Sequence, residues 1–80
     1  MKSISYSAEA LSQLRKLDPV VRGRIGKRLE VYAANSHGDV KKLRGRSGAR
    51  MRVGDWRVIF VEDFSTITVL SLGHRREIYD

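Results

Sequence analysis

The sequence has no cysteine, a single proline and no long apolar run. The absence of cysteine excludes a disulfide framework, a thiolate zinc site and a cysteine nucleophile. No apolar stretch approaches the roughly 20 residues that a membrane-spanning helix needs, and the N-terminus lacks the apolar core of a signal peptide. We therefore expect a cytoplasmic protein that does not act at a membrane.

The chain is also short. Its 80 residues fit a single domain over residues 1–80, because cores divide only at roughly 250 residues or more. The chain is too short to hold a cofactor-binding domain beside a substrate domain. The two histidines lie far apart in the sequence and no carboxylate cluster accompanies them, so no metal site is expected.

Acidic residues are scarce relative to basic ones. Sixteen Lys and Arg stand against nine Asp and Glu, and residues 41–57 alone carry seven basic side chains and one acidic one. Eleven of the basic residues are Arg, whose planar fork can hold a phosphate through two hydrogen bonds. This clustering predicts a polyanionic partner, with nucleic acid the first choice in the cytoplasm. A basic surface that only aids solubility is the alternative.

The first half of the chain predicts a short strand followed by two helices. The strand covers Lys2–Tyr6, where apolar side chains alternate. Ser7 and Asp18 are suited to cap the two helices, and Pro19 suits a first helical position. The apolar stripes of the helices are Leu11, Leu14 and Leu17, then Val21, Ile25, Leu29 and Tyr32. Their outward side carries Arg15, Lys16, Arg22, Arg24, Lys27 and Arg28.

The second half predicts three strands. The apolar period becomes two over Ala49–Val53, Trp56–Glu62 and Thr66–Leu72. A two-residue turn at Gly54-Asp55 joins the first two strands. The predicted fold class is α+β, in the order β-α-α-β-β-β, with a helical hairpin packed on an antiparallel sheet.

The turn fixes the register of this hairpin and gathers three arginines on one face. Arg52 lies opposite Arg57, and Arg50 lies on the same side. Like charges placed directly opposite each other destabilise a sheet, so the arrangement favours a bound anion such as phosphate. The alternative is that the three side chains extend into solvent, where their charges are screened.

The last residues add further candidates. Arg75 can clamp a phosphate and Tyr79 can stack on a base. His74 carries an imidazole, the type of side chain best suited to acid–base chemistry near neutral pH. A lone histidine is more often structural than catalytic, so both readings of His74 stay open. Trp56 falls at a core position of its strand, and His37 lies in a loop far from the basic block.

Three segments together resemble the RelE branch of the RelE/ParE type II toxins. They are Lys42–Gly45, Arg50–Phe60 and Gly73–Tyr79. The resemblance implies a metal-independent endoribonuclease, an mRNA interferase that cleaves mRNA in the ribosomal A site and so inhibits translation. It also implies an acidic, RelB-like antitoxin as partner, and binding of operator DNA only as the toxin–antitoxin complex. No cofactor is implied.

The family's catalytic positions fall on Arg50, Arg52, Arg57, Arg75 and Tyr79. The family prototype has Lys where this chain has Arg50 and Arg52, and Arg is too basic to act as a general base. Either His74 is the base, or the reaction depends on positioning and charge. For RNA and ribosome binding, the expected residues are Lys41, Lys42, Arg44 and Arg46.

Two other functions remain open. A ParE-type toxin of the same superfamily inhibits DNA gyrase and cleaves no RNA. A catalytically inactive nucleic-acid-binding module would keep the basic surface alone.

Overall fold

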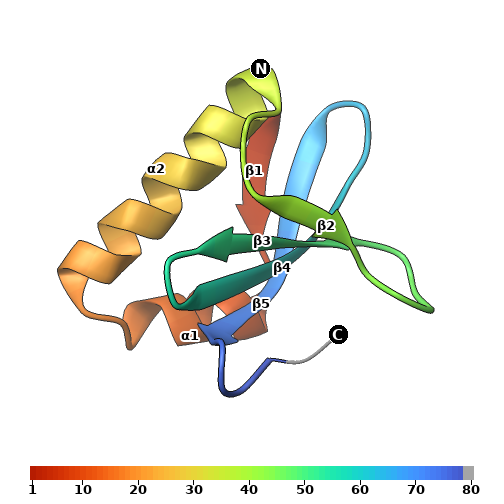
Figure 1. The fold of residues 1–80 in the computed structure, drawn as a ribbon. Helices are drawn as coiled ribbons and strands as arrows, with labels where there is room; N and C mark the ends of the chain where they lie inside the picture. The colour runs from red at the N-terminus through yellow and green to blue at the C-terminus, as the bar shows by residue number, and fades with distance from the viewer. Residues whose placement is uncertain (79–80) are drawn as a thin grey trace.

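The computed structural model describes residues 1–78. Two helices pack on one face of a five-stranded sheet (Figure 1), so the predicted α+β class is confirmed. The elements in chain order are β1 (Ser3–Tyr6), α1 (Ala8–Arg15), α2 (Pro19–Asn35), β2 (Val40–Lys42), β3 (Ala49–Val53), β4 (Trp56–Glu62) and β5 (Thr66–His74).

The sheet differs from the expected one in two respects. Its strand order is β1-β5-β4-β3-β2, and β1 runs parallel to β5 while the other neighbours are antiparallel, so the sheet is mixed. Parallel strands need a long connection, which the helices and β2–β4 supply. The additional strand is β2. It went unrecognised because three residues with two adjacent lysines show no two-residue apolar period.

The helix ends follow the predicted capping. The Ser7 hydroxyl accepts a hydrogen bond from the Ala10 amide at 3.0 Å, and the Asp18 carboxylate accepts one from the Val20 amide at 2.8 Å. Pro19 opens α2, as expected. Ser36 ends this helix in the left-handed region at φ 61°.

The core lies between the helices and the sheet. Ile25 and Leu29 of α2 are fully buried against sheet residues such as Phe60. In α1, Ala10 is fully buried while Leu11 is 37% exposed, so the predicted stripe is wrong at this position. The close approach of α1 to β5, marked by the Ser7 hydroxyl donating to the Leu70 carbonyl at 2.7 Å, favours a small side chain there.

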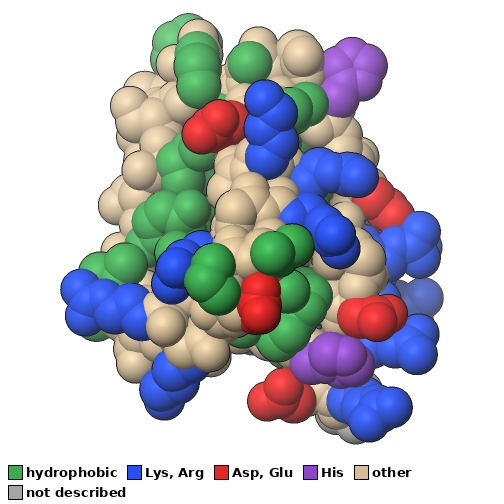
Figure 2. Space-filling model, turned by 90° about the vertical axis from the view of Figure 1, so that its left-hand side faces the viewer, with side chains coloured by type: hydrophobic (Ala, Val, Ile, Leu, Met, Phe, Trp, Pro, Cys, Tyr) green, Lys and Arg blue, Asp and Glu red, His purple; other side chains and the backbone are tan. Residues whose placement is uncertain are grey.

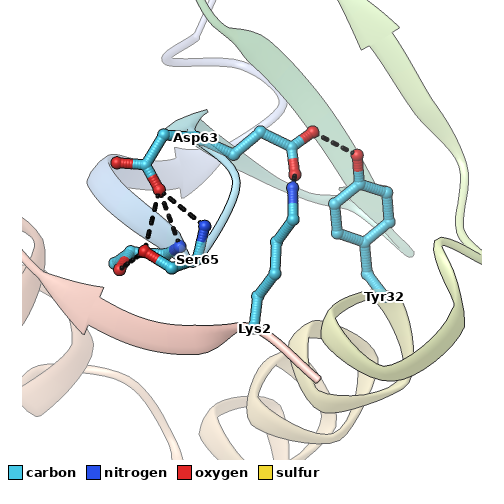
Figure 3. A network of polar contacts seen from close by, with 6 residues as sticks. Lys2, Tyr32, Asp63 and Ser65 are labelled. Carbon is cyan, nitrogen blue, oxygen red and sulfur yellow. Dashed lines mark hydrogen bonds and ion pairs between the residues drawn. The ribbon is translucent and has the colours of Figure 1, made fainter.

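A polar network joins the N-terminus, α2 and β4 (Figure 3). Lys2 Nζ lies 2.7 Å from Glu62 Oε2, and the Tyr32 hydroxyl donates to Glu62 Oε1 at 2.6 Å. These hydrogen bonds hold the pKa of Glu62 below its ordinary value. Burial, together with the bond to Glu62, raises the pKa of Tyr32 to about 12. The network therefore fixes the end of β4 that precedes the β4–β5 turn to α2.

A β-bulge interrupts the pairing of β4 with β5. Ile59 pairs with Ser71 and Phe60 with Val69, so Leu70 has no partner across the strands. An extra residue of this kind exchanges the two faces for every residue that follows it. Leu72 consequently points into the core, and it is 2% exposed.

Candidate nucleic-acid interface

The sheet face opposite the helices carries most of the expected site residues, and we call it the arginine face. Because paired residues on neighbouring strands share a face, the strand pairing defines two rows across it. One row is Arg52, Arg57 and Gly73; the other is Lys41, Arg50, Ile59 and Ser71. The register predicted from the Gly54-Asp55 turn is confirmed, including the direct opposition of Arg52 and Arg57.

Arg57 lies at the centre of the positive charge. Gly54 has φ 60°, as a tight hairpin turn requires of its first residue. Arg57 Nη1 donates to the carbonyls of Gly54 and Trp56 at 2.9 and 3.0 Å, which holds the guanidinium beside the turn. Burial and then the charges of Arg50, Arg52 and Arg75 lower the pKa of Arg57. Arginine remains protonated at neutral pH, so the group contributes a full positive charge.

Arg75 is held against the same turn. Its amide donates to the Asp55 carbonyl at 2.7 Å, and its Nε lies 3.7 Å from Asp55 Oδ1. The chain then folds back over β5, because a Cβ atom placed on Gly73 would lie 3.3 Å from Ile78 Cδ1. Residue 78 therefore reaches the arginine face beside the row of Arg57. Tyr79, the remaining expected residue of this group, lies outside the described residues.

Asp39 is a member of this face that the sequence analysis missed. Its Oδ2 lies 2.6 Å from Arg52 Nη2, and its carbonyl accepts the Arg52 amide hydrogen bond at 2.9 Å. A negative charge from the chain itself thus offsets part of the repulsion between Arg52 and Arg57. Recognition of Val40–Lys42 as a strand paired with β3 would have placed Asp39 opposite Arg52.

His74 is not brought together with the arginines. It pairs with Trp56 across the strands, and the two rings meet edge to face with centroids 5.5 Å apart. Trp56 packs against the core, so the His74 ring lies on the side of the sheet that the helices cover. His74 Nδ1 accepts a hydrogen bond from the Arg76 amide at 3.2 Å.

The four basic residues expected to bind RNA separate into different places. Lys41 lies next to Arg50 and lines a shallow hollow of about 60 Å³ with Asp39, Arg50 and Arg52. Lys42 lies on the other face and, with Arg46, lines a groove of about 660 Å³ beside the end of α2. Arg44 is exposed in the loop between β2 and β3.

Further basic side chains cover the helices. The six predicted on the outward side of the hairpin are all exposed: Arg15, Lys16, Arg22, Arg24, Lys27 and Arg28. Figure 2 shows the side of the molecule on which α2 lies in Figure 1. Lys and Arg side chains are spread over that view and gather along its right-hand edge, with Asp and Glu among them.

Within residues 1–78, no group of three or more His, Cys, Asp or Glu residues is arranged to hold a metal ion. Neither helix in this part of the chain is both long enough and apolar enough to cross a bilayer.

Comparison with known proteins identifies the family. A family model described as the ParE toxin of the type II toxin–antitoxin system parDE matches residues 4–79. No curated protein sequence gives a significant match.

Solved structures that resemble the chain include RelE toxins in complex with RelB antitoxins. The RelB–RelE antitoxin–toxin complex of Methanococcus jannaschii matches with a TM-score of 0.77 and 26% identity, over 95% of each chain. The RelBE2 complex of Mycobacterium tuberculosis matches with a TM-score of 0.80 and 20% identity, over 92% of this chain and 98% of that one. The RelBE complex of Escherichia coli matches with a TM-score of 0.73 and 24% identity, over 92% and 96%. This chain belongs to the RelE/ParE family of type II toxins, as its sequence motifs suggested.

Proposed function

We infer that the chain is a RelE-type toxin, a metal-independent endoribonuclease that cleaves mRNA in the ribosomal A site and so stops translation. One observation carries this proposal. Arg50, Arg52 and Arg57 share the sheet face that lies opposite both helices, and Arg75 is held at the β3–β4 turn beside them. Such a concentration of guanidinium groups suits a phosphate in an RNA backbone.

The chemistry follows from what RNA supplies. The ribose 2′-oxygen attacks the adjacent phosphorus, the bond from phosphorus to the 5′-oxygen breaks, and a cyclic phosphate and a 5′-hydroxyl result. The protein must align the attacking oxygen, stabilise the extra negative charge on phosphorus and allow a proton to reach the leaving oxygen.

The arginine face can meet the first two of these requirements. Arg57 and Arg75, both held at the β3–β4 turn, are assigned to the charge that develops on the phosphate. Arg50 and Arg52, on the neighbouring strand, are assigned to holding the RNA backbone. Tyr79 is assigned to orienting the nucleotide and assisting proton transfer. Arginine is a poor general base, and His74 lies on the other face, so positioning by the ribosome supplies much of the rate enhancement in this proposal.

The remaining basic residues are proposed to attract ribosomal RNA. Lys41, Lys42, Arg44 and Arg46 surround the β2–β3 loop and are exposed. Their charges act over about 10 Å at moderate salt, far enough to guide the approach to a polyanion.

The proposed partner is an acidic, RelB-like antitoxin encoded beside this toxin in a cytoplasmic system. The solved relatives include toxins in complex with RelB, and the net charge of +7 favours a partner of opposite charge. Operator DNA is expected to bind the toxin–antitoxin complex rather than the toxin alone.

Inhibition of DNA gyrase is the second candidate, because the matching family model is that of ParE toxins. Induced expression in a bacterial host separates the two functions. Under the proposal, protein synthesis stops, and primer extension shows breaks inside translated messages that disappear when the antitoxin is co-expressed. Supercoiling defects with intact mRNA would identify gyrase as the target. Harmless expression without an antitoxin would indicate an inactive nucleic-acid-binding module.

A further inference from the structure

Among the described residues, Asp39 places a carboxylate between the cations of the arginine face and contacts one particular arginine, Arg52. Asp39 lines the 60 Å³ hollow together with Lys41, Arg50 and Arg52, and its Oδ2 lies 2.6 Å from Arg52 Nη2. A phosphate group would bind the same guanidinium atoms through the same hydrogen bonds. Asp39 therefore occupies a position where the backbone of a nucleic acid could bind.

The ion pair contributes little to the stability of the fold. The side chains of Arg52 and Asp39 are 60% and 41% exposed, and pairs this open to solvent are weak. The backbone already holds the two residues opposite each other, since the Arg52 amide donates to the Asp39 carbonyl at 2.9 Å. The local structure therefore does not depend on the Asp39 carboxylate. Its main effect is on the binding of an anion to Arg52.

The two ends of the Arg52–Arg57 row differ in this respect. At the Arg57 end, Asp55 supplies a carboxylate that is 64% exposed and 3.7 Å from Arg75 Nε. At the Arg52 end, the carboxylate is in direct contact. An incoming phosphate meets less competition at Arg57 than at Arg52.

We propose that Asp39 is a specificity-determining residue that competes with RNA phosphate for Arg52 and so directs the scissile phosphate toward Arg57 and Arg75. This inference rests on the proposed RNA cleavage. In the free chain Arg52 is occupied by Asp39. When RNA binds, a phosphate near Arg52 must displace the carboxylate or remain at a distance from it, whereas a phosphate at Arg57 meets less competition.

The test compares Asp39→Asn with the unmodified chain for binding of a fluorescein-labelled single-stranded RNA, followed by fluorescence anisotropy. Asn has nearly the same shape and leaves the backbone pairing intact. Loss of one carboxylate close to a bound phosphate should tighten binding about three- to tenfold at low salt. Freeing Arg52 for one more phosphate should also steepen the slope of log affinity against log salt by about 0.7.

Glu9→Gln is the matched control. It removes one negative charge from the exposed first turn of α1, so it changes the net charge equally but far from Arg52. Its affinity should change by less than about twofold, because charges more than a Debye length apart are screened.

Arg52→Ala, alone and combined with Asp39→Asn, completes a double-mutant cycle. If Asp39 acts through Arg52, most of the gain from Asp39→Asn should be lost when Arg52 is Ala. Asp39→Ser provides a second variant should Asp39→Asn fail to fold, and thermal unfolding checks each protein. Unchanged or weaker RNA binding by folded Asp39→Asn and Asp39→Ser would overturn the inference while leaving RNA cleavage standing. An unmodified chain that neither binds nor cleaves RNA would overturn the proposed function and this inference together.

Discussion

The side chain of Ile78 lies over Gly73, so close that a Cβ atom at position 73 would come within 3.3 Å of Ile78 Cδ1. Gly73 is the cross-strand partner of Arg57. The absence of a side chain on this residue therefore lets the C-terminal segment lie beside the central arginine.

Gly73→Val tests this relationship. A branched side chain would displace Ile78 from its place over β5, on the side of the sheet where Arg57 lies. We expect mRNA cleavage on the ribosome to fall about tenfold or more, as small misplacements of catalytic groups do, with a modest loss of thermal stability. The control is Gly23→Ala on α2, where nothing lies within 4 Å of an added Cβ. This variant should be stabilised by about 0.5–1 kcal/mol and cleave normally. Normal cleavage by Gly73→Val would contradict the role of the C-terminal segment.

Arg57→Ala and Arg75→Ala should each lower the rate of cleavage by roughly two to three orders of magnitude, the usual cost of losing one group that stabilises charge in the transition state. Ribosome binding should change little, and both proteins should fold because neither side chain belongs to the buried core. Single-turnover cleavage of ribosome-bound mRNA measures the effect. A normal rate for Arg57→Ala would show that the arginine face is not the catalytic face.

Lys41→Ala and Lys42→Ala separate the two surfaces on which these neighbouring lysines lie. Lys41 belongs to the arginine face, whereas Lys42 lines the groove beside α2. Each loss of a phosphate contact should reduce the salt slope of ribosome binding by about one unit. If ribosomal RNA surrounds the toxin, we expect the salt slope to fall in both variants. The cleavage of bound mRNA should change only in Lys41→Ala. An unchanged slope in the double variant would contradict a role in RNA attraction.

His74→Ala should reduce cleavage by less than about threefold, because the ring packs against Trp56 and not among the arginines. Loss of this aromatic contact should instead lower the free energy of unfolding by about 0.5–1.5 kcal/mol. The pH profile of cleavage is the decisive measurement. A large rate loss with a shifted pH profile would instead identify His74 as the general base.

The Tyr32–Glu62 hydrogen bond predicts a dependence of stability on alkaline pH. The pKa of Tyr32 is raised from 10.0 to about 12 in the folded chain. Its stabilising contribution is therefore complete below pH 10 and is lost as the pH rises through about 12. Tyr32→Phe should be less stable at neutral pH, and the free energy of unfolding should fall less steeply over this range than in the unmodified chain. Chemical denaturation at several pH values measures both. Identical slopes would contradict the hydrogen bond.

The hairpin at the centre of the site could be predicted because its determinants are local. A two-residue turn with glycine first sets the register, and alternation then assigns Arg50, Arg52 and Arg57 to one face. The position of Asp39 depends instead on a three-residue strand whose pairing is fixed by its neighbour β3 rather than by its own pattern. The parallel pairing of β1 with β5 likewise joins segments more than 60 residues apart, and no local signal specifies its direction.

The face on which His74 lies could not be predicted from the sequence for a related reason. The predicted strand ended at Leu72, but β5 continues to His74 and includes an unpaired residue at Leu70. Alternation counted through this segment without the bulge would place His74 on the arginine face and Gly73 toward the helices.

The bulge at Leu70 determines which residues of β5 belong to the arginine face. If β5 kept all its residues but paired with β4 without this bulge, every side chain from position 71 to the end of β5 would change sides. The imidazole of His74 would then lie on the same face as Arg57, and the C-terminal segment would lose the bare glycine over which it folds. Whether a protein of this fold presents an imidazole or only fixed charges to its substrate can thus depend on one bulge in one strand, with no change in any of the reacting residues.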